Sequence, residues 1–454
     1  MQKLIGNTIL EFAREKKVNG RIKRTVVNRV QKHNDITPLV DKVLNEGNFN
    51  YFLNPDAILP LKKFFDGCLM TDHVNTASSM IIAGNSDVVA QAGNDAYAGT
   101  FTPRGSFNSV ESGLITGGFR NVWDWGTAYG NGTIASVCLC RSSVGKTERR
   151  TNSALTDSAS PFETLGSYTF TNQTYNFGYM PIIDYVKEKG YYLTYSSGTI
   201  TIKEYDINTF DIHVLGDTKN ARSVTEHTIS QSVSNYGSST SSLSYTGDYI
   251  HLLTWQSGTA VINDYAIKLS DWTCTLTTHT YTGCQFISRD VSWVGYPTKD
   301  AMLIRDGYIW ATSHNGQKIA KCSMTSDADV TLYDNPAYIC AVAAGSSSYG
   351  YGKFCLLPNG DFYIQAPNNY DYTTYYHNGV LYAVRGNQAV TGNSGTTGYQ
   401  VTDAGLIIQT YQSYSDGIML LSAYPYVSTV NNLDEAVTKS ADLTMKLTYE
   451  ITES

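Results

Sequence analysis

The chain has 454 residues and a formal net charge of −7, and only 16% of its residues are charged. A hydrophobic share of 42% is enough to build a core, so the composition excludes a wholly disordered chain, and the length predicts about three domains. Glycine (38) and tyrosine (34) are abundant while proline (11) is scarce. With so few charges, uncharged polar residues and tyrosines must cover the surface, which is a poor match to a cytosolic helical enzyme.

Neither a membrane-spanning segment nor a secretory signal is expected. No apolar run approaches the roughly 18 residues that a membrane span needs. The apolar stretch near the start is short and is followed, not preceded, by basic residues, unlike a secretory signal. We therefore expect synthesis in a cytoplasm, no signal peptide and no membrane partner.

Residues 1–75 are predicted to form a small helical region. Ile22, Val26 and Val30 follow one another at helical steps within a predicted helix over residues 9–30. A second helix is expected over 37–47, because Thr37 can cap it and Pro38 suits its first position. A third short helix over 59–67 follows the same pattern.

The helical region is also basic. The first 50 residues carry ten Lys and Arg against five Asp and Glu, so the remaining chain has a net charge of about −12. The basic side chains could form a solvated face or a face that docks on an acidic partner subunit. No aromatic residues alternate with these charges, so direct binding of nucleic acid is not expected. The candidate particle-anchoring residues are Arg21, Lys23, Arg24, Arg29 and Lys32.

Residues 76–430 are predicted to form a β-rich body. Six times, an alternating strand is followed by a glycine turn and a second alternating strand, and the turn glycines recur every 44 to 66 residues. Asn-Gly, Asp-Gly and Ser-Gly turns between such strands predict hairpins, because the turn needs positive φ. A repeat of this kind favours an irregular β-propeller of about 5–7 blades, with a large β-sandwich as the alternative. The turn glycines are Gly132, Gly198, Gly258, Gly316, Gly360 and Gly417.

Residues 431–454 end in a strongly alternating strand, which we expect either to close the body on an early strand or to pair with a neighbouring subunit. The apolar residues predicted to share one face of it are Leu443, Met445, Leu447, Tyr449 and Ile451.

Two segments support a family resemblance. Residues 436–449 (AVTKSADLTMKLTY) resemble the closing segment of structural proteins from phages of Gram-positive bacteria. Residues 117–127 (GGFRNVWDWGT) with 131–134 (NGTI) resemble another block of the same virion proteins, and residues 81–86 fit its lead-in. The resemblance implies a tail, baseplate, collar or fibre component.

The chemistry-bearing residues do not form a recognisable catalytic or metal-binding motif. The eight cysteines lack metal-site spacing, and Cys138 and Cys140 are expected to be buried free thiols on one face of a strand. The eight histidines are scattered. Residues 144–147 end like a phosphate-binding loop but lack its upstream glycine, so we interpret the match as chance. No catalytic residue, metal or cofactor is predicted.

Tyrosine is the more informative residue, because it offers a flat apolar face and a hydrogen-bonding tip. Its dense clusters suit stacking on sugar rings or packing between subunits, whereas ordinary strand packing is the alternative. The candidate receptor- or glycan-binding residues are Tyr349, Tyr351, Tyr370, Tyr372, Tyr375 and Tyr376.

The function predicted from sequence is that of a non-enzymatic virion structural protein. Its N-terminal region would assemble on the particle with other virion proteins and copies of itself. Its β-rich body would contact the host surface, where a cell-surface glycan is one candidate ligand. The alternatives are a glycosidase on a propeller scaffold, which needs two convergent carboxylates, and a head or collar decoration protein without a receptor role.

Overall fold

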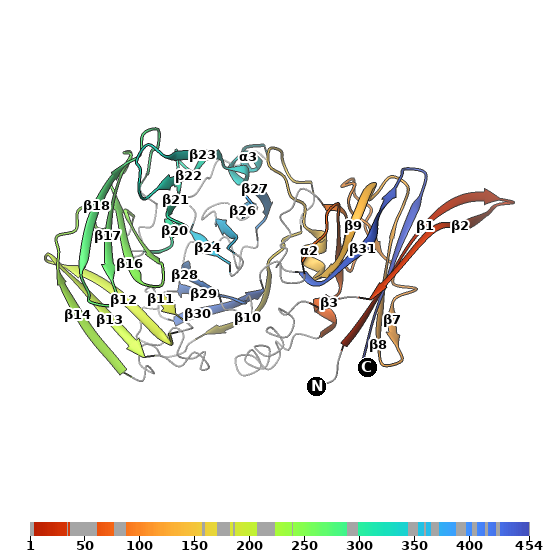
Figure 1. The fold of residues 1–454 in the computed structure, drawn as a ribbon, viewed down its shortest axis with the longest axis horizontal. Helices are drawn as coiled ribbons and strands as arrows, with labels where there is room; N and C mark the ends of the chain where they lie inside the picture. The colour runs from red at the N-terminus through yellow and green to blue at the C-terminus, as the bar shows by residue number, and fades with distance from the viewer. Residues whose placement is uncertain are drawn as a thin grey trace.

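The computed structural model describes residues 4–33, 35–36, 61–76, 88–156, 159–169, 182–184, 187–206, 223–237, 239–287, 298–343, 353–357, 360–364, 372–386, 396–401, 406–413, 416–423 and 427–453. These residues are mainly β and form two units, which lie side by side along the long axis of the molecule (Figure 1). One unit is a two-sheet module and the other is an irregular β-propeller.

The two-sheet module combines the two ends of the described chain. Its first sheet has the order β2-β1-β32-β8-β6, with β7 also paired to β8. Its second sheet has the order β3-β31-β9-β4-β5. The strands of the first sheet are β1 (Leu4–Val18), β2 (Arg21–His33), β6 (Ser106–Phe107), β7 (Gly113–Ile115), β8 (Gly118–Trp125) and β32 (Thr444–Glu453). Those of the second are β3 (Asp35–Ile36), β4 (Gly67–Thr71), β5 (Val88–Ala92), β9 (Gly132–Cys140) and β31 (Val427–Lys439).

The propeller consists, within the described residues, of five antiparallel sheets that serve as blades. Blade 1 contains β11 (Ile182–Asp184), β12 (Lys189–Ser196), β13 (Thr199–Asp206) and β14 (Ser223–Ser230). Blade 2 contains β15 (Ser241–Tyr245), β16 (Tyr249–Trp255), β17 (Val261–Lys268) and β18 (Cys274–Thr280), and β19 (Thr298–Lys299) runs parallel to β15. Blade 3 contains β20 (Leu303–Arg305), β21 (Tyr308–Ser313), β22 (Lys318–Ser323) and β23 (Val330–Asp334).

Blade 4 contains β24 (Phe354–Leu356), β25 (Phe362–Ile364), β26 (Tyr372–His377) and β27 (Val380–Arg385). Blade 5 contains β28 (Thr396–Val401), β29 (Leu406–Ser413) and β30 (Asp416–Ala423), and β10 (Glu163–Thr169) completes it. Because β10 precedes blade 1 in sequence yet pairs with β30, this one blade joins the start of the propeller to its end and closes the ring.

The propeller is inserted between two strands of the module that pair with each other. The chain leaves the module after β9 and returns at β31, and these two strands are antiparallel neighbours. One apolar cluster fills the space between the module's sheets, with Trp123, Met70 and Leu447 among its members. The same cluster continues into blade 4 through Tyr363 and Tyr375. The two units therefore share a core.

The predicted hairpins are confirmed at five of the six positions, although Gly417 lies within β30, opposite Gln412, and not in the turn. The pairs β12–β13, β16–β17, β21–β22, β24–β25 and β29–β30 are antiparallel, and each belongs to a different blade. Gly198 and Gly258 have φ values of +82° and +79°, as tight hairpin turns require. The sixth position was assigned wrongly, because the turn before β9 leads from β8 into the other sheet of the module. The predicted start of the β-rich body at residue 76 was therefore wrong as a propeller boundary.

The helix predicted over residues 9–30 is wrong, because β1 and β2 form a hairpin there. Asn19 and Gly20 have φ values of 49° and 80°, which is the Asn-Gly hairpin turn that the sequence analysis used elsewhere. Leu10 and Phe12 are buried two residues apart, a strand period rather than a helical one.

The other predicted N-terminal helices have different outcomes. Residues 37–47 lie outside the described residues. Of residues 59–67 the structure describes 61–67, where the short 3₁₀ turn η2 (Leu61–Phe64) precedes β4, which begins at Gly67. The other helices within the described residues are α2 (Ser142–Lys146) and α3 (Pro336–Ala343).

The C-terminal strand has the predicted face. Leu443, Met445, Leu447, Tyr449 and Ile451 are all buried, and β32 pairs with β1 on one side and β8 on the other. Of the two predicted outcomes, pairing with an early strand is the one observed, although the sheet belongs to the module and not to the propeller.

We predict that β32 is a main source of the module's stability. Leu447 is fully buried between Leu10 and Trp123 in register, so Leu447→Ala should lower the free energy of unfolding by about 3 kcal/mol. Its neighbour Thr448 lies on the other, half-buried face, and Thr448→Ala should change it by about 0.5 kcal/mol or less. Urea denaturation measures both, and equal effects would contradict the assigned face.

Candidate functional site

The β1–β2 hairpin extends beyond the sheet that holds its base. Ala13 is the last β1 residue paired with β32, while pairing with β2 continues to Val18. The register shifts beside Ala13, and a bulge of this kind bends and twists a strand pair. We call residues 14–25 the basic ribbon. Figure 1 shows its tip as the end of the molecule farthest from blades 1 and 2.

The basic ribbon carries six Lys and Arg but one acid, Glu15. All of its residues are exposed except Arg24, which is half-buried. Val18 and Ile22 are also exposed, at 43% and 70%. The ribbon is thus a solvated, cationic surface with apolar side chains among its charges.

The strand register sorts these charges onto two faces. Lys16 lies opposite Lys23, and Val18 lies opposite Arg21. Residues opposite each other share a face, and like charges in such pairs are destabilising. One face therefore presents Lys16, Arg21 and Lys23 without an acid, and Arg14 on the same face pairs with Asp442 at 3.3 Å. Glu15 lies opposite Arg24 on the other face.

The predicted anchoring residues all lie on β2, but they are not equivalent. Arg24 and Arg29 contact Glu11 at 3.3 and 3.5 Å, and Lys32 pairs with Asp434. Arg21 and Lys23 form no ion pair with any described residue. The sequence analysis missed Arg14, Lys16 and Lys17 on β1, which the Asn-Gly turn at 19–20 could have revealed by pairing the two basic segments.

The predicted tyrosine site is wrong at Tyr372 and Tyr375, which are buried. Tyr372 and Tyr375 are buried at 4% and 1% exposure, and Tyr375 donates a hydrogen bond to Asp361 at 2.8 Å. Tyr376 stacks on Phe362 with ring centroids 4.6 Å apart. Their role is strand packing in blade 4, because β26 is covered on both faces. Tyr349, Tyr351 and Tyr370 lie outside the described residues.

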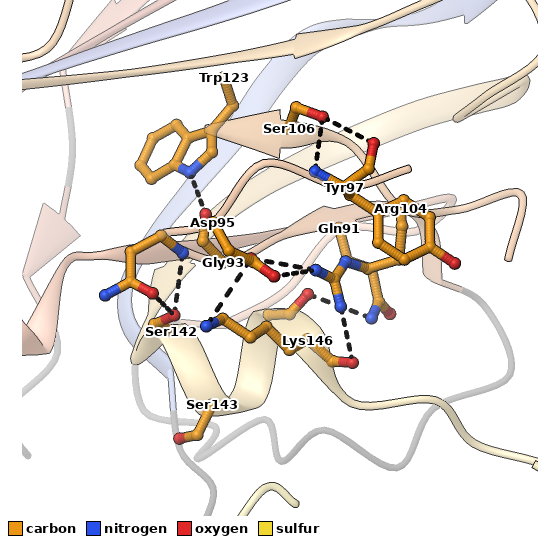
Figure 2. Close-up of polar contacts among 12 residues, drawn as sticks. Gln91, Gly93, Asp95, Tyr97, Arg104, Ser106, Trp123, Ser142, Ser143 and Lys146 are labelled. Carbon is orange, nitrogen blue, oxygen red and sulfur yellow. Dashed lines mark hydrogen bonds and ion pairs between the residues drawn. The ribbon is translucent and has the colours of Figure 1, made fainter. Parts of the chain in front are cut away.

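A buried polar network ties the module to the segment that leads into the propeller (Figure 2). The Arg104 guanidinium is 2% exposed and contacts both Asp95 oxygens, at 3.1 and 3.2 Å. It also donates to the Lys146 carbonyl at 3.0 Å, and the Gln91 amide donates to the carbonyls of Gly145 and Thr147. These contacts hold α2 against β5.

The residues that mimic a phosphate-binding loop belong to this network. A Cβ on Gly145 would lie 2.0 Å from the Ala92 carbonyl oxygen, so only glycine fits there. The Lys146 ammonium lies 3.7 Å from Asp95 (Figure 2). Beyond α2, Arg150 exchanges two backbone hydrogen bonds with Ala383 of β27. The segment therefore acts as a joint between the module and blade 4.

We predict that Arg104 stabilises this joint. Arg104→Met should lower the free energy of unfolding by about 2 kcal/mol, because the Lys146 carbonyl and Asp95 lose a buried partner. As the control, Arg14→Met removes an ion pair with Asp442 whose side chains are 70% and 58% exposed, and the loss should stay below about 1 kcal/mol. Chemical denaturation followed by tryptophan fluorescence compares the two, and a larger loss for the Arg14 variant would refute this assignment.

A second buried ion pair lies beside β15, the innermost antiparallel strand of blade 2. The Lys299 ammonium contacts Asp300 at 3.1 Å. The Asp300 amide donates to Leu243 and its carbonyl accepts from Phe354, both at 2.7 Å, so the residue links blade 2 to blade 4. Burial raises the pKa of Asp300, while Lys299 opposes the rise.

We predict that Asp300 makes stability depend on pH. A carboxyl group with a raised pKa in the folded state binds more protons there, so stability falls as pH rises through and above the ordinary value of 3.8. Asp300→Asn should therefore be more stable than the wild type at pH 7, and the advantage should shrink toward pH 3. Asn tolerates the φ of 53° at this position. Thermal unfolding across this range checks the sign, and an advantage that grows on acidification would contradict it.

The blade histidines are paired with carboxylates inside the propeller. The four pairs are His227–Glu204 at 3.0 Å, His251–Asp264 at 2.9 Å, His279–Asp327 at 2.9 Å and His377–Asp361 at 2.6 Å. Three of them join strands within one blade, while His279–Asp327 joins blades 2 and 3. They cross-link the blades and do not converge on one point.

The described cysteines are free thiols, and Cys138 and Cys140 are buried as predicted. Within the described ranges, no group of three or more His, Cys, Asp or Glu residues is arranged to hold a metal ion. Of the described helices, none has the length and apolar character that a membrane crossing requires.

Comparison with known proteins identifies similar solved structures but no family. No family model and no curated protein matches the sequence. Solved structures that are similar include a protein of unknown function from Bacteroides thetaiotaomicron VPI-5482, at 10% identity and a TM-score of 0.34, over 79% of this chain and 90% of that one. The WD40 domain of Toxoplasma gondii coronin matches at 9% identity and a TM-score of 0.28, over 83% and 89%.

A GH43 glycoside hydrolase also matches, at 9% identity and a TM-score of 0.24, over 70% of this chain and 53% of that one. The assignment of an irregular β-propeller rests on the chain's own succession of small sheets. At these scores, none of the matches transfers a function to the present chain.

Proposed function

We propose that this chain is a structural component of a virus particle, in a tail, baseplate, collar or fibre. In this proposal the two-sheet module assembles on the particle through the basic ribbon, and the propeller projects toward the host surface. The observation that carries the proposal is that Lys16, Arg21 and Lys23 share one face of the ribbon without an acid, because such a surface is costly until an acidic partner covers it.

The position of the two segments that resemble phage virion proteins supports the same roles for the module and the propeller. Residues 117–134 contribute β8 and the start of β9, and residues 436–449 contribute the end of β31 and much of β32. Although about 300 residues apart in sequence, β8 pairs with β32 and β9 pairs with β31. The resemblance to phage virion proteins thus falls within one structural unit, the module that carries the ribbon. Residues 81–86 lie outside the described residues.

The arrangement of the ribbon and the blades along the long axis also favours this role. The ribbon and blades 1 and 2 lie at opposite ends of the long axis (Figure 1). A protein that is held at its cationic end would therefore keep these blades away from its attachment point. Many copies on a symmetric particle would convert weak contacts per blade into strong overall attachment.

We predict that incorporation into particles depends on the ribbon's charge. A variant with five of the six ribbon cations changed to Gln (Lys16, Lys17, Arg21, Lys23 and Arg24) keeps the Asn-Gly turn of the hairpin and removes most of its positive charge. Its amount in gradient-purified virus particles should fall about tenfold or more relative to the wild type, as measured by quantitative mass spectrometry.

The control changes three half-exposed or exposed lysines outside the ribbon to Gln, namely Lys63, Lys203 and Lys318. It should be incorporated normally. Absence of the wild-type chain from purified particles would refute the proposal, as would equal incorporation of the ribbon variant. Release of reducing sugar ends from host glycans by the purified chain would favour the glycosidase alternative instead.

A further inference from the structure

The turns of blades 1–3 differ sharply in charge between the two ends of their strands. At one end of the strands, the described connections contain no Asp, Glu, Lys or Arg. These connections follow β12, β14, β16, β18, β21 and β23, and the last of them includes α3. They comprise residues 197–198, 231–237, 239–240, 256–260, 281–287, 314–317 and 335–343. Within the described residues, each connection at the other strand ends carries at least one acid, and the connection before β12 also carries Lys187. We call these residues the acidic turns: Glu188, Asp248, Asp271, Asp306, Asp327 and Asp329.

The acidic turns contact neighbouring blades. Lys187 of blade 1 lies 3.8 Å from Asp248 of blade 2, so the acidic turns of these two blades are adjacent. Within blade 2, the Leu269 amide donates to the Asp248 carbonyl at 3.0 Å. In blade 3, the Asp327 carboxylate accepts a hydrogen bond of 2.7 Å from the amide of Thr280, which is the last residue of β18 and lies at the end of that strand opposite to Asp271.

The local cations do not neutralise this surface. Lys187, Lys268 and Arg305 contact acids there. These three cations face seven acids, which are the six residues of the acidic turns and Asp184. The side chains of Asp248 and Asp306 remain 88% and 77% exposed. The excess of about four negative charges resembles in size the five net positive charges of the basic ribbon.

Within one molecule these two surfaces do not meet. The ribbon lies at one end of the long axis, and β14 and β18 lie at the other (Figure 1). Their complementarity can therefore be used only between molecules. The apolar side chains of Val18 and Ile22, exposed at the ribbon tip, would add contact area to a charge-guided encounter.

We propose that the basic ribbon of one copy docks on the acidic turns of blades 1–3 of a second copy. This head-to-tail contact joins two different surfaces, so it can propagate into a ring or a row of copies. The inference rests on the proposed assembly role of the ribbon and names its partner as another copy of this chain. A single ribbon is a small interface, so the contact is weak between free molecules and is strengthened by repetition in an assembly.

Sedimentation velocity of the purified full chain over a concentration series tests this proposal. The wild type should self-associate in about 0.1 M NaCl and dissociate in about 1 M NaCl, where the Debye length falls from about 10 Å to about 3 Å. The ribbon-reversed variant (Lys16→Glu, Arg21→Glu, Lys23→Glu) should remain monomeric. The turn-reversed variant (Asp248→Lys, Asp271→Lys, Asp306→Lys) should also remain monomeric. All six side chains are exposed, and circular dichroism verifies that both variants fold.

The decisive measurement combines the two variants. A mixture of them should associate, because each supplies a surface complementary to the other, and a single chain with all six reversals should associate with itself. A wild type that stays monomeric would overturn the inference. Failure of the mixture and of the six-fold variant to associate would also overturn it.

These outcomes are separable from those for the proposed function. If the wild type is monomeric alone but enters particles in a ribbon-dependent manner, the ribbon has a different acidic partner and only the present inference fails. If the chain self-associates through the ribbon but is absent from particles, the self-contact stands and the virion role fails.

Discussion

The rest of the structure depends on two sets of strand pairings, β31 with β9 and β32 with β1 and β8, which join the two ends of the described chain in the module. The propeller lies between β9 and β31 in sequence, so these ladders determine where both of its chain ends leave the module. Closing so long an excursion costs entropy, but that cost grows only slowly with length. The apolar cluster that contains Trp123, Leu447 and Tyr363 offsets it by joining module and blade 4 in a shared core.

The propeller ring is also closed by pairing between strands that are far apart in the sequence. Blade 5 takes β10 from before blade 1 and β28–β30 from the end of the propeller, so opening the ring requires breaking a full strand pairing. The His–carboxylate pairs and the Lys299–Asp300 pair add polar links within and between blades. Buried charges of this kind are stable only when their partners are in place, which ties local polar contacts to the completed fold.

The buried charges of the joint stabilise the fold, whereas the exposed charges of the ribbon are available for assembly. Inside the joint, Arg104 is almost fully buried and is matched by Asp95 and a backbone carbonyl. On the ribbon, Lys16 and Lys23 oppose each other in full solvent. Solvent screens the second arrangement, so it can persist without unfolding the hairpin, yet it leaves a surface that gains from an acidic partner. We interpret this difference as the physical basis of the proposed assembly role.

The sequence by itself determined the local hairpins and strand faces, because positive φ at Gly198 or Gly258 and the alternation over residues 443–451 depend on neighbouring residues only. It also contained the Asn19–Gly20 turn, which a competing helical spacing of Ile22, Val26 and Val30 obscured. Only the tertiary structure decided that β8 and β9 belong to different sheets, that Tyr372 and Tyr375 are buried, and that Lys16 faces Lys23. Those outcomes depend on which distant strand covers each face, and no local pattern specifies that partner.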